Sequence, residues 1–282
     1  MTGKASPERI GLIAGQGELT RIAADHLRES GTGVMAVGFD DETAATLEGH
    51  VDHFERLRLG QLGKLMSTFN RHRVKTILMI GKIHKVRIYR DVRPDGRALL
   101  LWKKLLDRRD DTILHALVEE LEKDGFRVAR ADRLLRHLLA PQGRISRRSP
   151  DRRERGDIAF GWKIAKGIGR LDLGQTVAVK NRAPVAVEAI EGTDRTIARA
   201  GELAGPGTVV VKVAKPQQDF RFDVPVVGIE TIRSLVAAGS SALAVEAGKT
   251  LFVQREASLP LMQRNRIAFW GFTHAEFASK GS

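Results

Sequence analysis

Carboxylates gather at two places in the C-terminal half of this 282-residue chain. Glu188, Glu191 and Asp194 lie in the stretch VEAIEGTDRTIARAGEL, around a glycine where a strand should give way to a helix. Asp219 and Asp223 follow a further apolar strand in VKVAKPQQDFRFDVP. With no cysteine and few histidines nearby, such carboxylates suit a hard cation, Mg²⁺ or Mn²⁺, whose other ligands are water and phosphate oxygens.

Basic side chains accompany the second group of acids. Lys212, Lys215 and Arg221 would neutralise phosphate oxygens opposite the metal. A second interpretation needs no site, because Thr193 or Asp194 also fits a helix N-cap and the two later aspartates fit ordinary turns. Spacing alone leaves both interpretations open.

The stretch GLIAGQGEL predicts a ligand loop between a strand and a helix near the N-terminus. Gly15 and Gly17 would let a phosphate or nucleotide approach the backbone N–H groups at the start of the helix. The dinucleotide fingerprint G-x-G-x-x-G is incomplete, since Thr20 takes the place of its third glycine. A nicotinamide-dependent enzyme, with Asp40 or Asp41 on the ribose, is therefore a weaker alternative.

Three other motifs give no support for a further enzyme class. EAGKT at 246–250 lacks the upstream glycine of a P-loop and precedes a strand, so it predicts a turn. EGHVDH at 48–53 lacks the helical His spacing of a zinc hydrolase and reads as a surface loop. No G-x-S-x-G motif occurs, which leaves a serine hydrolase unsupported.

The elements that must position these residues alternate between strands and helices. In the first half, apolar strands at 9–15, 31–39 and 75–83 with helices between them predict a Rossmann-like parallel sheet. The second half has closer strands and a KNRA hairpin turn, which predict a mixed α/β domain. We expect an α/β protein with domains at 1–143 and 144–282, an Arg-rich linker at 141–150, and an active site in the cleft between the domains.

The net charge of +13 and the absence of cysteine bear on the partners and the cellular compartment of the protein. A chain this basic is drawn to nucleic acid, anionic lipid headgroups or phosphorylated substrates. Only 5% of the residues are aromatic and no nucleic-acid-binding motif occurs, so we expect no nucleic-acid partner. No apolar run is long enough to span a bilayer, and the absence of cysteine fits a cytoplasmic protein.

Several segments together resemble one family, the UDP-2,3-diacylglucosamine pyrophosphatases of the lipid A pathway that are unrelated to calcineurin-like phosphoesterases. The resemblance covers nearly the whole chain and is most specific in VEAIEGTD and KVAKPQQDFRFDVP; it also includes IGLIAGQGELTRIAA, GKIHKVRIYRD and AVEAGKTLFV. It implies Mg²⁺- or Mn²⁺-dependent hydrolysis of a UDP-linked diacylated glucosamine to UMP and 2,3-diacylglucosamine 1-phosphate. It also implies a homodimer in peripheral contact with the cytoplasmic face of the inner membrane.

The resemblance places the family's catalytic aspartate in QDFRFD, where Asp223 or Asp219 is the matching position. Glu188, Glu191 and Asp194 are the candidate metal ligands. The candidate substrate-binding residues are Gly15, Gln16, Gly17, Lys82, Thr193, Lys212, Lys215, Gln218 and Arg221. The acyl chains need an apolar groove, for which LLLWKKLLD and IAFGWKIAKGIG are candidates. The alternative function is a non-catalytic protein that binds a nucleotide sugar or a lipid.

Overall fold

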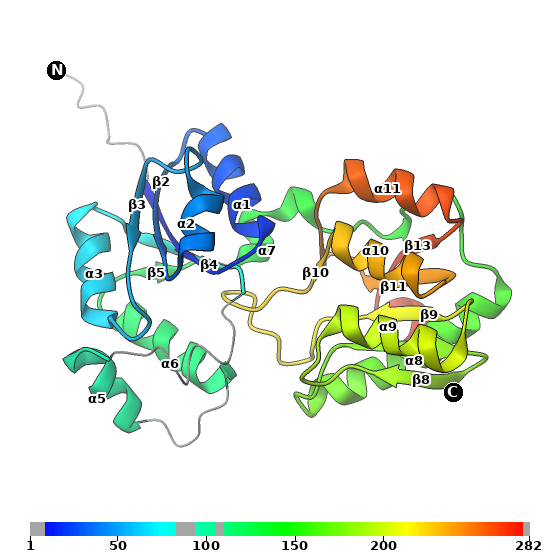
Figure 1. The fold of residues 1–282 in the computed structure, drawn as a ribbon. Helices are drawn as coiled ribbons and strands as arrows, with labels where there is room; N and C mark the ends of the chain where they lie inside the picture. The colour runs from blue at the N-terminus through cyan, green and yellow to red at the C-terminus, as the bar shows by residue number, and fades with distance from the viewer. Residues whose placement is uncertain (1–8, 83–93, 105–109, 279–282) are drawn as a thin grey trace. The chain divides into compact units, whose positions relative to one another are not determined.

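The computed structural model describes residues 9–82, 94–104 and 110–278 (Figure 1). The chain forms two compact units, which we call the first and the second domain. The first domain comprises residues 1–134 together with 220–222, and the second comprises 135–219 and 223–282. From residue 83 onward, the stretch GKIHKVRIYRD lies outside the described residues.

A parallel sheet of five strands forms the centre of the first domain, in the order β3-β2-β1-β4-β5. The strands are β1 (Arg9–Ala14), β2 (Gly33–Gly38), β3 (His53–Arg56), β4 (Thr76–Ile80) and β5 (Arg127–Val128). β1, β2 and β4 consist almost entirely of buried apolar residues, as strands covered on both faces require. The strand order reverses between β1 and β4, which is where open α/β sheets bind ligands.

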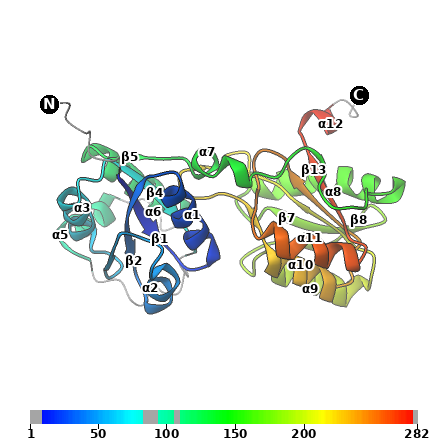
Figure 2. The same ribbon diagram turned by 90° about the horizontal axis from the view of Figure 1, so that it is seen from above.

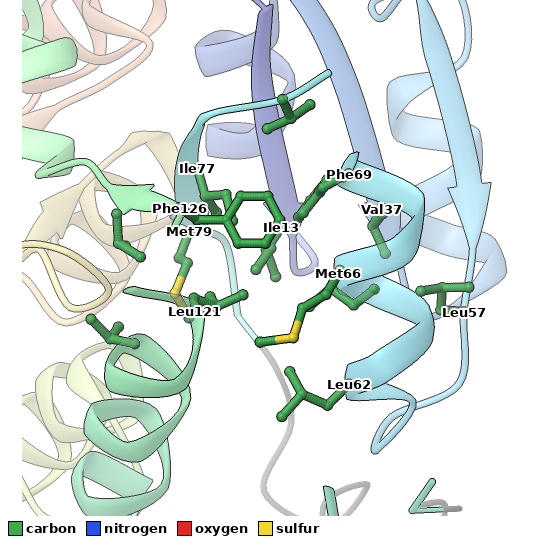
Figure 3. Packing of buried hydrophobic residues seen from close by; sticks show 14 of the residues in the cluster. Ile13, Val37, Leu57, Leu62, Met66, Phe69, Ile77, Met79, Leu121 and Phe126 are labelled. Carbon is green, nitrogen blue, oxygen red and sulfur yellow. The ribbon is translucent and has the colours of Figure 1, made fainter. Parts of the chain in front are cut away.

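Helices cover both faces of this sheet (Figure 2). They are α1 (Glu18–Glu29), α2 (Asp41–Leu47), α3 (Leu62–Arg71), α5 (Gly96–Lys104), α6 (Asp110–Lys123) and α7 (Ala131–Leu134). Apolar side chains from α3 and α6 pack against alternate residues of β1, β2 and β4 to form one core cluster (Figure 3). Phe69 and Phe126 meet edge to face in this cluster, with ring centroids 6.2 Å apart.

The second domain contains a mixed sheet in the order β6-β13-β11-β9-β7-β8. These strands are β6 (Gly143–Arg144), β7 (Thr176–Lys180), β8 (Ala183–Val187), β9 (Val209–Lys212), β11 (Ala242–Glu246) and β13 (Ala268–Phe272). β9, β11 and β13 run parallel, whereas β7 pairs antiparallel with both β8 and β9. The short strands β10 (Val226–Val227) and β12 (Leu251–Phe252) form a separate parallel pair.

Alternate strand residues point to opposite faces, so the second domain has two cores. On one face, α8 (Arg152–Arg170) packs on the sheet, and a Cβ added to Gly161 would lie 2.9 Å from Val179 and Val211. The other face carries α9 (Thr193–Ala204), α10 (Ile229–Ala237) and α11 (Arg255–Arg264) (Figure 1). The helix α12 (Ala275–Ala278) and the short 3-10 helix η1 (Arg136–Leu138) complete the domain.

The predicted α/β class with two domains is confirmed. The KNRA turn does join β7 and β8, and Asn181 and Arg182 take left-handed conformations with φ of 54° and 58°. EAGKT forms the turn between β11 and β12, as expected. EGHVDH forms a surface loop as expected, and only its last residue, His53, belongs to β3. One local interpretation was wrong: the stretch 141–150 contains β6, which pairs with β13, so it is not a bare linker.

A capping box in which Glu154 is buried starts α8. The Asp151 carboxylate accepts a hydrogen bond from Glu154 N at 2.7 Å, and Glu154 accepts one from Asp151 N at 2.8 Å. Arg148 donates to both carboxylate oxygens of Glu154 at 2.8 Å. Burial by itself raises the pKa of Glu154, but these hydrogen bonds outweigh it and hold the pKa below its ordinary 4.5.

Because this pKa is lower in the folded chain than in the unfolded chain, Glu154 stabilises the fold above pH 4.5 and loses that effect as the pH falls further. We expect Glu154→Gln to lower the free energy of unfolding at neutral pH by about 1.5–3 kcal/mol. The variant should also lose less stability than the native chain on acidification. Urea unfolding from neutral to acid pH measures both effects, with the exposed Glu202→Gln as control. Parallel pH curves for the native chain and Glu154→Gln would contradict the assignment.

Candidate functional site

The predicted glycine loop of the first domain lies where β1 and β4 end. Gln16 and Lys82 form a two-way backbone bridge of 2.8 and 2.9 Å. A Cβ on Gly15 would come within 2.7 Å of the Lys82 carbonyl oxygen, so only glycine permits this approach. Gly17, with φ of 104°, precedes α1 and offers no side-chain cap to its N–H groups. The structure thus brings Gly15, Gln16, Gly17 and Lys82 together.

Thr20 explains the departure from the dinucleotide fingerprint. Its side chain is fully buried and its hydroxyl donates to the carbonyl oxygen of Gly17. The residue therefore closes the first turn of α1 from within. Thr20 stabilises the loop. Its side chain fills the position that the third glycine of the fingerprint would leave open.

Glu188 is the centre of a hydrogen-bonded group at one edge of the second sheet. Only 7% of its surface is exposed. Its carboxylate accepts from Gln175 N at 3.0 Å and from the Thr193 hydroxyl at 2.9 Å. Lys212, also buried, donates to the same hydroxyl at 2.9 Å, and Thr176 lies 3.2 Å from it. Three predicted residues, Glu188, Thr193 and Lys212, thus meet in one network.

The other two acids of the first group have different surroundings. Glu191 pairs with Arg199 at 2.5 Å and accepts a hydrogen bond from Ala189 N at 3.1 Å. Asp194 lies in the first turn of α9, and its Oδ1 atom is buried without a hydrogen-bond partner among the described residues. A buried carboxylate oxygen of this kind is a natural position for a cation or a donor from a ligand.

Asp223 is held by two of the predicted residues. The amide of Gln218 donates to the Asp223 carboxylate and, at 3.0 Å, to its carbonyl oxygen. Lys215 Nζ lies 3.9 Å from the same carboxylate and 2.5 Å from Asp172. The lysine therefore bridges two carboxylates, one of which, Asp172, was not predicted.

The tripeptide between the two candidate aspartates belongs to the first domain. Phe220 accepts a backbone hydrogen bond from Ala131 N at 2.8 Å, and Arg221 pairs with Glu122 at 3.1 Å. Phe222 packs on the core of that domain and meets the His115 ring edge to face at 5.0 Å. Asp219 and Asp223 themselves belong to the second domain. A backbone hydrogen bond of 2.9 Å from Asp223 N to the carbonyl oxygen of Asp219 closes the loop that contains the tripeptide.

The three carboxylates proposed as metal ligands do not form a ready-made cation site. Within residues 9–82, 94–104 and 110–278, no three His, Asp or Glu side chains converge as metal ligands would. Glu188 and Glu191 each have hydrogen-bonding partners in the protein. A divalent cation bound by Glu188 or Glu191 would have to draw these side chains from their present contacts.

Sequence reasoning missed a buried ion pair at the same sheet edge. Lys166 of α8 and Glu246 at the end of β11 lie 2.6 Å apart, and Glu246 is 2% exposed. Burial lowers the pKa of Lys166, whereas hydrogen bonds from Lys166 and Lys249 lower that of Glu246 despite its burial. Both residues also bind the backbone of Ala214, next to Lys215. In the sequence, a glutamate at the end of an apolar strand, Glu246, could have indicated this ion pair.

The two stretches considered for an acyl-chain groove have different roles. In IAFGWKIAKGIG, Ile158, Trp162 and Ala165 pack in the core beneath α8. In LLLWKKLLD, by contrast, Leu101 and Trp102 line a cavity of about 190 Å³ in the first domain. The first stretch is therefore mainly structural, and the second borders open apolar space.

A basic groove of about 840 Å³ runs along the exposed side of α8. It is lined by Pro150, Arg152, Arg155, Gly156, Ala159, Phe160, Lys163 and Arg182. None of its four cationic side chains forms an ion pair with a carboxylate in the part of the chain that the structure describes. Arg155 also lies over the Trp270 ring at 5.2 Å. We refer to this surface as the basic groove.

Fold and site together define a two-domain α/β protein. Its first domain has a glycine loop at the switch point of a parallel sheet. Its second domain gathers carboxylates and lysines at one sheet edge. No helix in the described ranges has the length and apolar character needed to cross a bilayer.

Comparison with known proteins supplies the family. The N-terminal domain of LpxI matches residues 9–138, and its C-terminal domain matches residues 141–270. A protein of Caulobacter vibrioides named UDP-2,3-diacylglucosamine pyrophosphatase LpxI is 30% identical over 260 residues, which cover 88% of this chain and 92% of that protein. The chain belongs to the LpxI family.

Two solved structures are more distant. A UDP-glucose-4-epimerase from Stenotrophomonas maltophila with NAD and formylated UDP-arabinopyranose has a TM-score of 0.33 and 12% identity, covering 95% of this chain and 94% of that one. AnUbiX (PadA1) in complex with FMN and dimethylallyl pyrophosphate has a TM-score of 0.20 and 10% identity over 43% of this chain and 94% of its own. Neither resemblance is close enough to support an argument.

The ion pair between Lys166 and Glu246 generates a stability prediction. Glu246→Gln should lower the free energy of unfolding by about 3 kcal/mol, because it leaves the buried lysine without a charged partner. The double variant Lys166→Met/Glu246→Gln removes both charges and should regain most of the loss. Urea unfolding measures all three proteins. A single variant as stable as the native chain would show that the pair contributes little.

Proposed function

We propose that this protein hydrolyses the pyrophosphate bond of a UDP-linked 2,3-diacylglucosamine and releases UMP and 2,3-diacylglucosamine 1-phosphate. The observation that carries the proposal is membership of the LpxI family over both domains, including a relative whose name states that activity. The lysines and carboxylates at the edge of the second sheet support it, because they provide groups for a diphosphate and for an attacking water.

Asp223 is the proposed catalytic residue. Gln218 and Lys215 approach its carboxylate and would hold it in place, so that it could orient or deprotonate water as a general base. Lys215 would stabilise charge that develops on the phosphate oxygens, and Lys212 would do the same from the Glu188 network. Asp219 stays an alternative position for the same role.

Dependence on Mg²⁺ or Mn²⁺ forms part of the proposal. Asp194 supports it, since its buried Oδ1 atom has no protein partner within the described ranges and carboxylate oxygen is a preferred ligand of Mg²⁺. A bound divalent cation would polarise the phosphorus–oxygen bonds of the diphosphate. Loss of activity in chelator, with recovery on adding Mg²⁺ or Mn²⁺, is the expected result.

We also propose that the protein works as a homodimer at the cytoplasmic face of the inner membrane. The basic groove supports the membrane contact, because its four cations, which have no acidic partner among the described residues, attract anionic headgroups. Phe160 in the same groove adds an apolar surface for the boundary between headgroups and acyl chains. Such membrane contact is needed because the acyl chains of the proposed substrate lie in the bilayer.

Replacement of the two aspartates tests the catalytic assignment. Asp223→Ala should reduce UMP release by at least about a hundredfold, the typical contribution of a general base. Asp223→Asn keeps the hydrogen-bonding shape and should be similarly inactive, because it lacks the basic carboxylate. Asp219→Ala tests the alternative position and should retain more activity than Asp223→Ala.

UMP release is measured from the diacylated substrate with Mg²⁺ present, after unfolding curves confirm that each variant is folded. Near-native turnover in both alanine variants would remove the catalytic role of this segment. Binding of the UDP-sugar without any product from the native protein would instead favour the non-catalytic alternative.

Charge reversal in the basic groove tests the membrane contact. Arg152→Glu/Lys163→Glu should weaken binding to anionic vesicles by more than about tenfold, since each basic residue near such a surface contributes roughly 1 kcal/mol. Arg233→Glu/Arg264→Glu on α10 and α11 changes the net charge equally on the opposite face of the sheet and should bind almost normally. Vesicle sedimentation with phosphatidylglycerol measures both variants. Equal losses would show that only net charge matters.

A further inference from the structure

We infer that the ion pair of Lys166 and Glu246 positions Lys215 and Asp223 for the hydrolysis, a role that rests on the proposed function. Both members of the pair bind the backbone of Ala214, which is 1% exposed. Lys166 Nζ donates to the Ala214 carbonyl oxygen at 2.7 Å, and the Glu246 carboxylate accepts from Ala214 N at 3.0 Å. Because they act through the backbone, Lys166 and Glu246 are positioning residues and not catalytic ones.

The first argument is the place in the fold at which the pair acts. β9 ends at Lys212, and its pairing with the parallel strand β11 stops there. Two residues further on, Ala214 has a buried N–H group and a buried carbonyl oxygen, which are costly without partners. The side chains of Lys166 and Glu246 supply these partners in place of a strand. The pair therefore fixes the course of the chain where it leaves the sheet.

The second argument is the series of contacts that leads from Ala214 to the proposed general base. Lys215 N donates to the side-chain oxygen of Gln218 at 2.7 Å, so the amide nitrogen of Gln218 is directed to Asp223. That nitrogen donates to the Asp223 carboxylate and, at 3.0 Å, to the Asp223 carbonyl oxygen. Lys215 Nζ lies 3.9 Å from the same carboxylate. A displacement of Ala214 would therefore reach the Asp223 carboxylate through a single amide side chain.

The third argument is the use of charged groups for this purpose. A buried ion pair contributes little to stability by itself, and apolar residues of similar volume often replace it without loss. Charged groups do, however, form shorter and stronger hydrogen bonds than neutral ones. Glu246 is fixed on both oxygens, by Lys166 at 2.6 Å and by Lys249 at 2.9 Å. A carboxylate held in this way gives the Ala214 backbone a rigid support that an apolar core would not give.

The double variant Lys166→Met/Glu246→Gln separates positioning from stability. It should regain most of the stability that Glu246→Gln loses, but it leaves the Ala214 carbonyl oxygen without its donor. We expect kcat for UMP release to stay at least about tenfold below native, because a misplacement of roughly 1 Å at reacting groups can cost about a hundredfold. KM should stay near native, as it does when the lost interaction is made in the transition state.

Glu154→Gln is the matched control. It removes another buried carboxylate that contacts α8, and it should cost a comparable amount of stability. The Glu154 carboxylate binds Arg148 and Asp151 N, which lie outside the segment 214–223, so kcat should stay native at a temperature where every variant is folded. If kcat recovered with stability in the double variant, or fell equally in Glu154→Gln, the role of the pair would be structural only.

A second variant guards against misfolding of the first. Glu246→Asp keeps a negative charge opposite Lys166, but its side chain is one methylene shorter. It therefore cannot reach Lys166 and Ala214 N together without moving the backbone. We expect a smaller loss of stability than in Glu246→Gln and a kcat again at least about tenfold below native. Native kcat in either folded variant would overturn the inference.

Hydrogen–deuterium exchange separates this inference from the proposed function, because it needs no enzyme assay. In the double variant, a peptide covering residues 209–219 should lose protection, while peptides from the sheet of the first domain keep theirs. Loss of protection together with a native protein that releases no UMP would reject the proposed function alone. A native enzyme that releases UMP, with kcat and protection unchanged in the double variant, would reject the positioning role alone.

Discussion

The buried charges at one edge of the second sheet constrain the rest of the site. Glu188, Lys212 and Glu246 lie at or just beyond the ends of β8, β9 and β11 in the same sheet and are all below 10% exposed. A charged group taken out of water is costly unless hydrogen bonds and opposite charges surround it. Each of these side chains therefore fixes partners from several elements, and those partners determine where the loops after β8, β9 and β11 run.

This constraint explains how remote residues position the candidate site residues. Glu246 and Lys166 hold both polar groups of the Ala214 backbone, and Lys215 follows directly. Lys215 in turn approaches Asp172 and Asp223, while its backbone N–H donates to Gln218 at 2.7 Å. The position of the Asp223 carboxylate thus depends on a lysine in the middle of α8, although that lysine is distant in sequence.

The sequence indicated the strands and helices whose pattern is local. β1, β4 and β9 are apolar runs bounded by turns, and α3 has a regular apolar stripe. β3 was not predicted because it is a short edge strand with charged residues, and its pairing with β2 depends on tertiary contact. α11 was not predicted, because it contains Pro260 and has a weak helical pattern.

The contacts among the candidate site residues were only partly predictable from the sequence. Glu188, Thr193 and Lys212 do meet, as do Lys215, Gln218 and Asp223. Their further partners Gln175 and Asp172 come from the loop between α8 and β7, which no spacing rule connects to these motifs. The family resemblance could not supply these contacts, since it concerns motifs along the chain and not the folded backbone.

The tripeptide Phe220–Phe222 makes the first domain discontinuous in sequence. A polypeptide that ends at Leu134 lacks the phenylalanine that lies against His115 and the arginine that pairs with Glu122. Such a fragment would expose apolar core surface and would tend to aggregate. The two halves of the gene therefore cannot be separated and recombined freely, and any exchange of the N-terminal half between relatives must carry its matching tripeptide with it.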